Sequence, residues 1–513
     1  MYSQSQEEEE GNSSSTSSQT LLSHGQRSNY KSLDSSYEWN VEVDMKGQVD
    51  TGDCTTEKFS FNKLMQYTGP GWLMAIAYLD PGNLESDLQS GAVAGCKLLW
   101  LLFWSHAAGL AMQILSARLG VVTQHHLAQL IRKNYSRSLS IIIWLFTQLA
   151  IIGSDIQEII GTAIALKILF GLRIWVGVLI TASDTFVFMW LQQYGVRKIE
   201  VFFMTLIGVM IGCFWIEMFV SKPNIEMIIK GILIPQIPSE AKVQAVGMVG
   251  AVIMPHNMFL HSALVMSRNI GAKPSENKKK EANYYFAIES ALALFISYLI
   301  NLAIVVVFAQ VFYKPGETLK SLPGLYDASE ALSKTLGKSA KYFWAFGLLA
   351  AGQSSTMTGT LAGQYVVEGF LGAIFKKQWH RIALTRAIAL VPSMLVAILA
   401  VDNFDTMGEF LNVLQSLCLP TAIIPILKLT ASTKIMTKTF RNSRVTNIMC
   451  WMISFIVIGF NVHLFINYLQ ELNWPLYAVM FSVTYFSFVV YLIFTPLEIP
   501  DTKEAEDTER HRL

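Results

Sequence analysis

The sequence predicts an all-α polytopic membrane protein with about twelve transmembrane helices, on three observations. Apolar residues make up 52% of the 513 residues and charged residues only 15%, whereas soluble domains carry about 25% charged residues. The mean hydropathy of the whole chain is positive, at +0.39. Apolar stretches of about 20 residues, which is enough to cross a bilayer, recur along the chain. Because lipid offers no partner to backbone polar groups, these stretches are expected to be helices.

Overall charge and cysteine spacing exclude several classes of protein. The 39 basic and 38 acidic residues leave a net charge of +1, so the chain has no basic excess with which to bind nucleic acid. Its five cysteines lie far apart without a Cys-x-x-Cys pair, which argues against a zinc site and a disulfide framework. The sequence also shows no nucleophile–base set and no cofactor-binding loop. We therefore predict neither an enzyme nor a resident cofactor.

The two ends of the chain, residues 1–62 and 498–513, differ from the apolar middle. The first combines an acidic run with Ser/Thr-rich sequence and shows no apolar periodicity. Such sequence buries too little surface to offset its ordering entropy, so we expect a disordered cytosolic tail at each end. Within the first tail, Tyr30-Lys31-Ser32-Leu33 has the Tyr-x-x-aliphatic form of an endocytic sorting signal. This motif makes sorting adaptors candidate partners.

Twelve apolar stretches between the tails are the expected transmembrane helices. They lie near residues 66–92, 97–120, 140–170, 173–192, 199–220, 243–266, 284–312, 342–373, 383–401, 409–430, 446–467 and 475–496. If the N-terminus is cytosolic, the loops after even-numbered spans are cytosolic too. Those loops are rich in Lys and Arg, whereas the short opposite loops at 402–409 and 468–474 contain neither. The positive-inside rule therefore predicts twelve spans with both termini in the cytosol.

Two of these spans carry the same proline motif in the middle of the membrane. The first contains Asp80-Pro81-Gly82-Asn83, and the sixth contains Met254-Pro255-His256-Asn257. Proline removes a backbone donor and clashes with the preceding turn, so each helix is expected to break there. Breaks at corresponding positions in two halves of a chain indicate the binding site of an inverted-repeat transporter.

The residues around the breaks predict a site for a divalent transition metal. A carboxylate at this depth costs about 2.5–3.5 kcal/mol, so Asp80 is expected to have a function. Asn83 adds an amide oxygen, and the carbonyl of Ala251, one turn before the second break, can turn inward. Met254 adds a thioether, a soft ligand that a Ca²⁺ or Mg²⁺ site does not need. This set of ligands suits Mn²⁺ or Fe²⁺.

The two broken-helix motifs and a third run, Gly352 to Thr360 followed by Gly363-Gln364, resemble the natural resistance-associated macrophage proteins (NRAMP). These are proton-coupled divalent metal transporters, and Met254 makes the chain more similar to the eukaryotic metal carriers than to members that move magnesium or aluminium. The resemblance implies a LeuT-like fold of two inverted five-helix repeats plus two further helices, with helices 1 and 6 broken. The implied parts are a first repeat at 63–220, an outer loop at 221–242, a second repeat at 243–432 and the last two helices at 433–497.

The resemblance also implies roles for individual residues. It implies Asp80, Asn83, the Ala251 carbonyl and Met254 as metal ligands, completed in some states by Gln415 in the tenth span. The implied route for protons comprises Asp80, His256, Glu158, Asp155, Arg268 and Arg386. Asp155 and Glu158 stand three positions apart in the third span, so they are expected to share one face of its helix.

Together these features predict a secondary active transporter that imports Mn²⁺ or Fe²⁺ into the cytosol with protons, by alternating access. The ions are cargo, and the lipid bilayer is the main partner. We expect the protein in an endosomal, lysosomal or phagosomal membrane or in the plasma membrane. Two alternatives stay open. One is an amino-acid/cation symporter of the same fold, which Asp80 and Met254 oppose, and the other is a metal sensor that does not transport.

Overall fold

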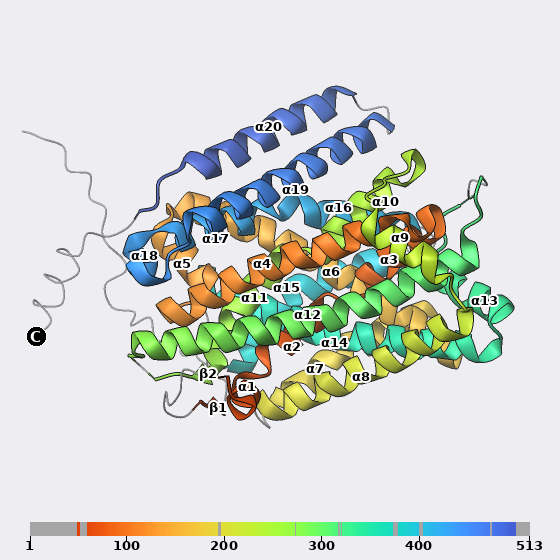
Figure 1. Ribbon diagram of the computed structural model, residues 1–513, viewed down its shortest axis with the longest axis horizontal. Helices are drawn as coiled ribbons and strands as arrows, with labels where there is room; N and C mark the ends of the chain where they lie inside the picture. The colour runs from red at the N-terminus through yellow and green to blue at the C-terminus, as the bar shows by residue number, and fades with distance from the viewer. Residues whose placement is uncertain are drawn as a thin grey trace, which may run out of the picture. The chain divides into compact units, whose positions relative to one another are not determined.

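Helices make up almost all of the computed structural model (Figure 1). It describes residues 49–51, 59–192, 196–271, 273–316, 319, 321–372, 378–399, 404–471 and 475–498. Of the expected N-terminal tail, it therefore includes only residues 49–51 and 59–62. The sorting motif Tyr30 to Leu33 and most of the expected C-terminal tail lie outside the described residues.

Long or paired helices within the described ranges correspond one to one to the predicted spans. In chain order they are α2 (Pro70–Ala77) with α3 (Pro81–Ala94), α4 (Leu99–Thr123), α6 (Arg137–Phe170), α7 (Ile174–Gln192), α8 (Val196–Ser221), α10 (Lys242–Val252) with α11 (Pro255–Leu264), α12 (Glu276–Phe312), α14 (Lys338–Leu371), α15 (Gln378–Leu399), α16 (Phe404–Cys418) with α17 (Pro420–Ala431), α19 (Arg444–Glu471) and α20 (Pro475–Phe494). Among the described residues, six segments are long and apolar enough to cross a membrane by length and composition alone. The prediction of an all-α membrane protein is confirmed.

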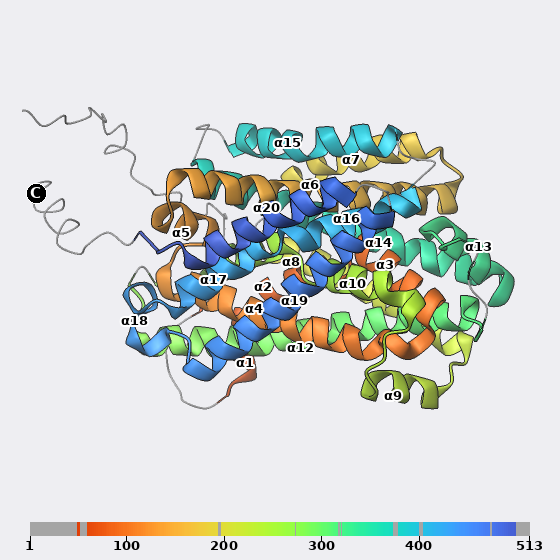
Figure 2. The ribbon, with the colours of Figure 1, turned by 90° about the horizontal axis from the view of Figure 1, so that it is seen from above.

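Short elements lie at the two ends of the helix bundle. They are β1 (Val49–Asp50), α1 (Phe61–Tyr67), η1 (Gly95–Leu98), α5 (Leu127–Asn134), α9 (Ile225–Leu233), η2 (Ser239–Ala241), η3 (Val265–Ser267), β2 (Arg268–Asn269), α13 (Leu325–Thr335) and α18 (Thr433–Phe440). Figures 1 and 2 place α1, α5 and α18 at one end and α9 and α13 at the other. We call these the α1 end and the α9 end. At the α1 end, β1 pairs with β2 in parallel, with Val49 opposite Arg268.

Within the described residues, three spans are interrupted, and each interruption directly precedes a proline. The two predicted breaks fall before Pro81 and Pro255. The third, which was not predicted, separates α16 from α17 before Pro420. In a continuous helix, the N–H of residue 420 would bond to the Ser416 carbonyl, but proline has no N–H. The Ser416 carbonyl instead accepts from the N–H of Leu419 at 3.1 Å, which tightens the turn.

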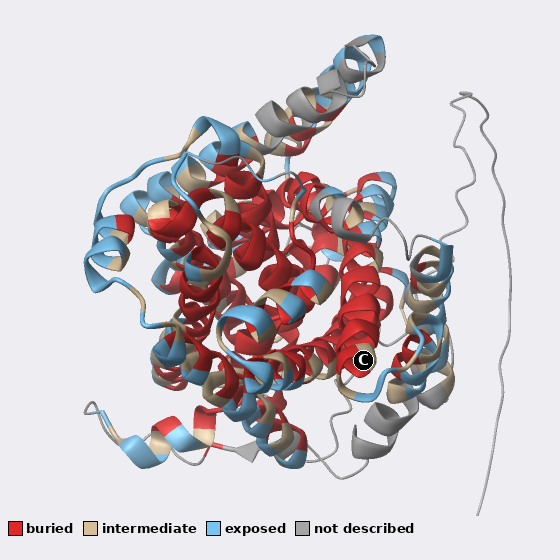
Figure 3. Cartoon of the chain, turned by 90° about the vertical axis from the view of Figure 1, so that its right-hand side faces the viewer, coloured by how far each residue is buried: buried red, intermediate tan, exposed pale blue. Residues whose placement is uncertain are grey.

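Burial separates a packed interior from an apolar outer surface. Figure 3 shows the buried residues gathered in the centre of the bundle and the exposed residues on its outer helices. Large apolar side chains are among the exposed ones, including Val201 on α8, Leu395 on α15 and Phe486 on α20. An outer surface of this kind is unfavourable in water and suits a hydrocarbon environment.

The run Gly352 to Thr360 lies in α14 and lets this helix approach α6 closely. A Cβ added at Gly352 would lie 2.0 Å from Thr162 Oγ1 on α6. A Cβ added at Gly359 would lie 3.2 Å from an oxygen of Asp155 and 3.2 Å from an oxygen of Glu158. Small residues therefore allow two central helices to meet where α6 carries its carboxylates.

Candidate metal site between two broken helices

The first break places Asp80 at the N-cap of helix α3. In a continuous helix the N–H of residue 81 would bond to the carbonyl of Ala77, but residue 81 is proline. Helix α2 therefore ends at Ala77, and α3 begins at Pro81. One carboxylate oxygen of Asp80, Oδ1, accepts from the backbone N–H and from the side-chain amide of Asn83, both at 2.8 Å. The other oxygen, Oδ2, is buried and has no hydrogen-bond partner among the described residues.

The second break leaves a carbonyl without its helical donor. The N–H of residue 255 would bond to the Ala251 carbonyl in a continuous helix, but residue 255 is again proline. Helix α10 ends at Val252, and Met254 stands in extended conformation at the start of α11 (φ −89°, ψ 136°). The backbone chemistry is thus the same at both breaks, with Ala77 and Ala251 as the equivalent carbonyls.

Helix α16 contacts the elements that carry both breaks. A Cβ added at Gly82, in the first break, would lie 2.5 Å from Gln157 Oε1 on α6. The Gln157 side chain in turn donates to Asn412 Oδ1 at 2.9 Å and accepts from the side-chain amide of Gln415 at 2.8 Å. On the other side, a Cβ added at Gly250 of α10 would lie 2.9 Å from the Cβ of Ser416. Gln415 is therefore linked to the first break through Gln157, and its neighbour Ser416 packs against α10 before the second break.

Every predicted metal ligand is closed off from solvent. Asp80, Asn83 and Met254 are each 1% exposed, and Ala251 and Gln415 are fully buried. The oxygen Gln415 Oε1, like Asp80 Oδ2, is buried without a hydrogen-bond partner among the described residues. Buried acceptors left unsatisfied are costly, and a cation would satisfy both. The donor types present (carboxylate, amide, carbonyl and thioether) fit a divalent transition metal.

Sequence reasoning did not single out Gln157 or Asn412, although their side chains hold Gln415 in place. Both residues are buried in apolar helices, and Gln157 directly precedes Glu158. A neutral amide in a membrane span is a weaker signal than a charge, because it finds a hydrogen-bond partner at lower cost. The contact also joins residues 258 positions apart, which no local pattern indicates.

The residues predicted to carry protons fall into separate groups. Asp155 and Glu158 share one face of α6, as expected, and meet α14 at Gly359. Glu158 also accepts from the hydroxyl of Ser154 at 2.9 Å. His256 is buried on α11, two residues after Met254, and its Nδ1 has no hydrogen-bond partner among the described residues. Arg386 belongs to α15, but its side chain lies outside the part of the chain that the structure describes.

Arg268 lies apart from the metal ligands, in a buried polar cluster at the α1 end. It forms an ion pair with Glu200 of α8 at 2.6 Å and donates to the carbonyls of Tyr67 and Thr68, at 3.3 and 2.5 Å. Beside this pair, Glu289 of α12 accepts from the backbone N–H groups of Gly69 and Gly71. Glu200 and Glu289 were not predicted, although each is an acidic residue within an expected span or at its boundary.

Gly69, between α1 and α2, is required by this cluster. Its φ of +149° is unfavourable for residues with a side chain. A Cβ at this position would lie 2.1 Å from both Arg268 and Glu200. The glycine therefore lets the start of α2 fit against the ion pair.

Comparison with known proteins agrees with the sequence motifs. A family model described as natural resistance-associated macrophage protein-like matches residues 71–467. The chain is 50% identical over 441 residues to the metal transporter nramp1 homolog of Dictyostelium discoideum, covering 84% of this chain and 81% of that protein. It is 47% identical over 464 residues to natural resistance-associated macrophage protein 2 of Mus musculus, covering 85% of this chain and 81% of that protein.

Solved structures show the same fold. A mutant of a manganese transporter from Eremococcus coleocola is 30% identical, with a TM-score of 0.77, and the match covers 88% of this chain and 97% of that chain. Mhp1, a nucleobase-cation-symport-1 family transporter, matches with a TM-score of 0.51 at 16% identity, covering 87% of this chain and 96% of that chain. At that identity the likeness concerns the fold alone. The predicted LeuT-like fold is confirmed.

Proposed function

Because the chain belongs to the natural resistance-associated macrophage protein family, we propose that it imports Mn²⁺ or Fe²⁺ into the cytosol together with protons. Family membership makes the chain a metal transporter and not an enzyme, as predicted. The choice of metal, the coupling to protons, the direction and the residues that act belong to the proposal. The cargo ions are substrates, and the proposal requires no resident cofactor.

One observation carries the proposal: the oxygen Oδ2 of Asp80 is buried and has no hydrogen-bond partner among the described residues. Asn83 fixes the other oxygen of this carboxylate through two hydrogen bonds, so the free oxygen has a defined position. A carboxylate inside a membrane costs at least about 2.5–3.5 kcal/mol, and a bound dication offsets that cost. Gln415 Oε1 and the Ala251 carbonyl supply further oxygens, while the Met254 sulfur favours Mn²⁺ or Fe²⁺ over Ca²⁺ and Mg²⁺.

Alternating access requires the sealed site to open toward each end of the bundle in turn. Basic residues favour the α1 end as cytosolic. Within the described part of the chain, this end carries Arg132 and Lys133 on α5, Lys278 to Lys280 on α12 and Lys434 and Lys438 on α18. We assign residues 63–220 and 243–432 to the two inverted repeats, 221–242 to the outer loop and 433–497 to the two further helices. Residues 1–62 and 498–513 would then be cytosolic tails.

Protons need a route that does not pass through lipid. His256 follows the metal ligand Met254 by two residues, and its free Nδ1 can take up a proton released at Asp80. Asp155 and Glu158, on the shared face of α6, are the next candidate acceptors. Arg268 and Arg386 would complete the route by the family resemblance.

The proposed direction of transport also limits which membranes can contain the protein. Import into the cytosol fits an endosomal, lysosomal or phagosomal membrane, or the plasma membrane. The motif Tyr30 to Leu33 would direct the choice among them through sorting adaptors.

The two alternatives make different demands on the site. An amino-acid/cation symporter of the same fold must bind a substrate carboxylate, which the negative charge of Asp80 would repel. The match to Mhp1 extends to the fold alone and does not favour this alternative. A metal sensor would bind the ion without moving it, so a measured flux separates it from a transporter.

Uptake by proteoliposomes tests the proposal. We expect Mn²⁺ uptake that accelerates when the outside is made more acidic than the inside. Asp80→Asn keeps the size and one oxygen but removes the charge, so uptake should fall at least about 100-fold, equal to about 2.7 kcal/mol. Glu330→Gln, at an exposed position of α13, is the control and should retain wild-type uptake. Near-normal uptake by Asp80→Asn would contradict the assigned site.

A further inference from the structure

The short helix α1 lies across the beginning of α12 at the α1 end of the bundle. Its buried residues are Leu64 and Tyr67, while Phe61, at its first position, is 65% exposed. The Tyr67 ring stacks on Tyr285 of α12 with centroids 5.4 Å apart, and it meets Phe286 edge-on at 5.3 Å. Helix α1 is therefore docked on α12 rather than projecting from the bundle.

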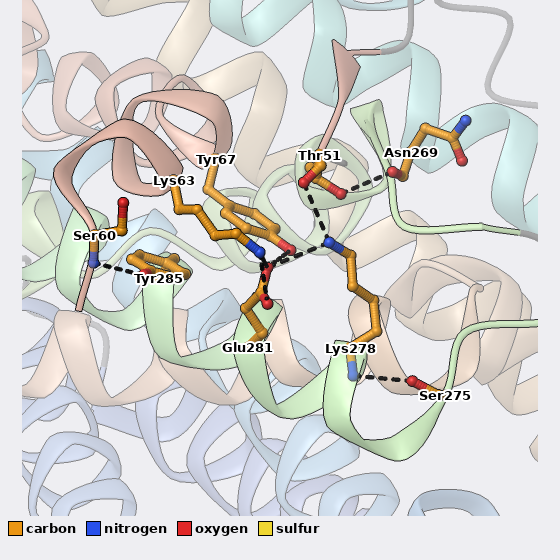
Figure 4. Close-up of polar contacts among 9 residues, drawn as sticks. All are labelled: Thr51, Ser60, Lys63, Tyr67, Asn269, Ser275, Lys278, Glu281 and Tyr285. Carbon is orange, nitrogen blue, oxygen red and sulfur yellow. Dashed lines mark hydrogen bonds and ion pairs between the residues drawn. The ribbon is translucent and has the colours of Figure 1, made fainter. Parts of the chain in front are cut away.

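Glu281 of α12 accepts hydrogen bonds from two side chains of this docked helix (Figure 4). Both of its oxygens accept from Lys63 of α1 at 2.9 Å, and Oε1 also accepts from the Tyr67 hydroxyl at 3.1 Å. Lys278, one turn earlier on α12, is the third donor, at 3.2 Å. The side chains of Lys63, Lys278 and Glu281 are only 13%, 9% and 7% exposed.

Lys278 extends the cluster to the chain that precedes α1. Its ammonium group also donates to the carbonyl of Thr51 at 3.2 Å. The Thr51 hydroxyl donates to the carbonyl of Asn269 at 2.9 Å, next to the pairing of β1 with β2. The first residue of β2 is Arg268, whose side chain donates to the carbonyls of Tyr67, at the end of α1, and Thr68, just before α2. Glu281 is thus linked to three segments that meet around the first half of the broken helix.

Helix α2 runs from Pro70, near the α1 end, to the break before Pro81, and only Thr68 and Gly69 separate it from α1. In the proposed alternating access, a movement of α2 would open a path from Asp80 toward the α1 end. With so short a linker, a movement of α2 away from α12 would pull on α1 and so on the ion pair between Lys63 and Glu281.

We propose that Glu281 is a positioning residue: by holding α1 against α12, it sets how often the metal site opens toward the α1 end. We call the contact between Lys63 and Glu281 the latch, and we call helix α2, which in this proposal closes the site at this end, the gate. The inference rests on the proposed function in that the site opens toward the α1 end, and it adds that α2 is the part that moves. Weakening the latch shifts the equilibrium toward the open gate without changing any metal ligand. A merely structural role would instead lower the stability of the whole bundle.

Hydrogen–deuterium exchange of the purified full-length chain in lipid nanodiscs tests the latch. The reporter is the peptide that covers residues 61–77. Glu281→Gln and Lys63→Gln should each raise its exchange rate roughly five- to tenfold, as expected for losing one coupled contact. The double variant should exceed Glu281→Gln by little, because one latch is lost in both. If Glu281→Gln does not fold, Lys63→Gln alone carries the test, since it leaves Glu281 paired with Lys278.

The matched control is Glu226→Gln. Glu226 and Lys230 also form an ion pair, at 2.5 Å, but it is exposed on α9 at the other end. This variant should leave exchange in residues 61–77 unchanged. Unchanged exchange in both latch variants would overturn the proposal, and so would an equal rise across α6, which would indicate global destabilisation. The exchange result does not depend on the cargo, so a wild-type protein that moves no Mn²⁺ would refute the proposed function and not the latch.

Discussion

Gln157 offers a direct test of how the site is held closed. Its side chain joins α6 to α16 through three hydrogen bonds: from Gln415 at 2.8 Å, to Asn412 at 2.9 Å and to the Gly408 carbonyl at 3.2 Å. Gln157→Leu keeps a similar volume but removes all three. We expect the variant to fold and to bind Mn²⁺ more weakly, because Gln415 loses the contact that aims its side chain.

The structure sets the size of the effect. Interhelical hydrogen bonds within membranes average about 0.6 kcal/mol each, so three of them amount to about 1.8 kcal/mol. That energy stabilises the closed site relative to states in which α16 has moved away. Since 1.4 kcal/mol corresponds to a factor of about ten, the apparent Kd for Mn²⁺ should rise roughly 20-fold.

Isothermal titration calorimetry of the purified protein measures this Kd, and thermal unfolding checks that the fold is intact. Gln148→Leu is the matched control. Gln148 is buried on the same helix, and its amide atoms have no hydrogen-bond partner among the described residues. The control should bind Mn²⁺ like the wild type. Equal Kd values for the two variants would show that Gln157 does not position the site.

Two further predictions concern metal choice and coupling. Met254→Ala removes the thioether but leaves the oxygens, so Cd²⁺ uptake should fall at least about tenfold while discrimination against Ca²⁺ weakens. If the uptake of Cd²⁺ and of Ca²⁺ changes by the same factor, Met254 contributes packing and is not a ligand. Glu158→Gln and His256→Ala should reduce proton entry per Mn²⁺ transported by at least about half, measured as internal acidification and uptake in the same liposomes. The control is Glu217→Gln, which removes a buried carboxylate of α8 and should leave the ratio of protons to Mn²⁺ unchanged. If the ratio is unchanged in all three variants, Glu158 and His256 are not part of the proton route.

The sequence was sufficient to predict the broken helices because their cause is local. A proline prevents the N–H bond to the carbonyl four residues earlier, whatever surrounds it, so the breaks before Pro81 and Pro255 could be placed within a residue or two. The same rule applies to Pro420, but its surroundings, Leu419-Pro420-Thr421-Ala422, lack the x-Pro-x-Asn pattern that singled out the other two breaks. An acidic residue in an apolar span is equally local, which is why Asp80 and Glu158 stood out.

What could not be predicted depends on which distant helices meet. The contact of Gln157 with Gln415 joins residues 258 positions apart. The contact of Lys63 on α1 with Glu281 joins residues 218 positions apart. Neither the apolar period nor the charge pattern of one segment indicates its neighbour. The stretch 1–62 was expected to lack structure from its composition, and residues 49–51 and 59–62 form contacts that composition does not predict.

The kind of contact that holds α2 also bears on how its end of the bundle can open. Its first turn donates a hydrogen bond to Glu289, the Thr68 carbonyl just before it accepts from Arg268, and α1 is held by Glu281. When such polar contacts part in the presence of water, the groups exchange one hydrogen-bond partner for another, so the net cost per bond is about 0.5–1.5 kcal/mol. Apolar surface of similar size would lose its burial outright when wetted. A polar cluster at the end that must admit water therefore allows tight closure and repeated opening, whereas the apolar outer faces of α19 and α20 suit permanent contact with lipid.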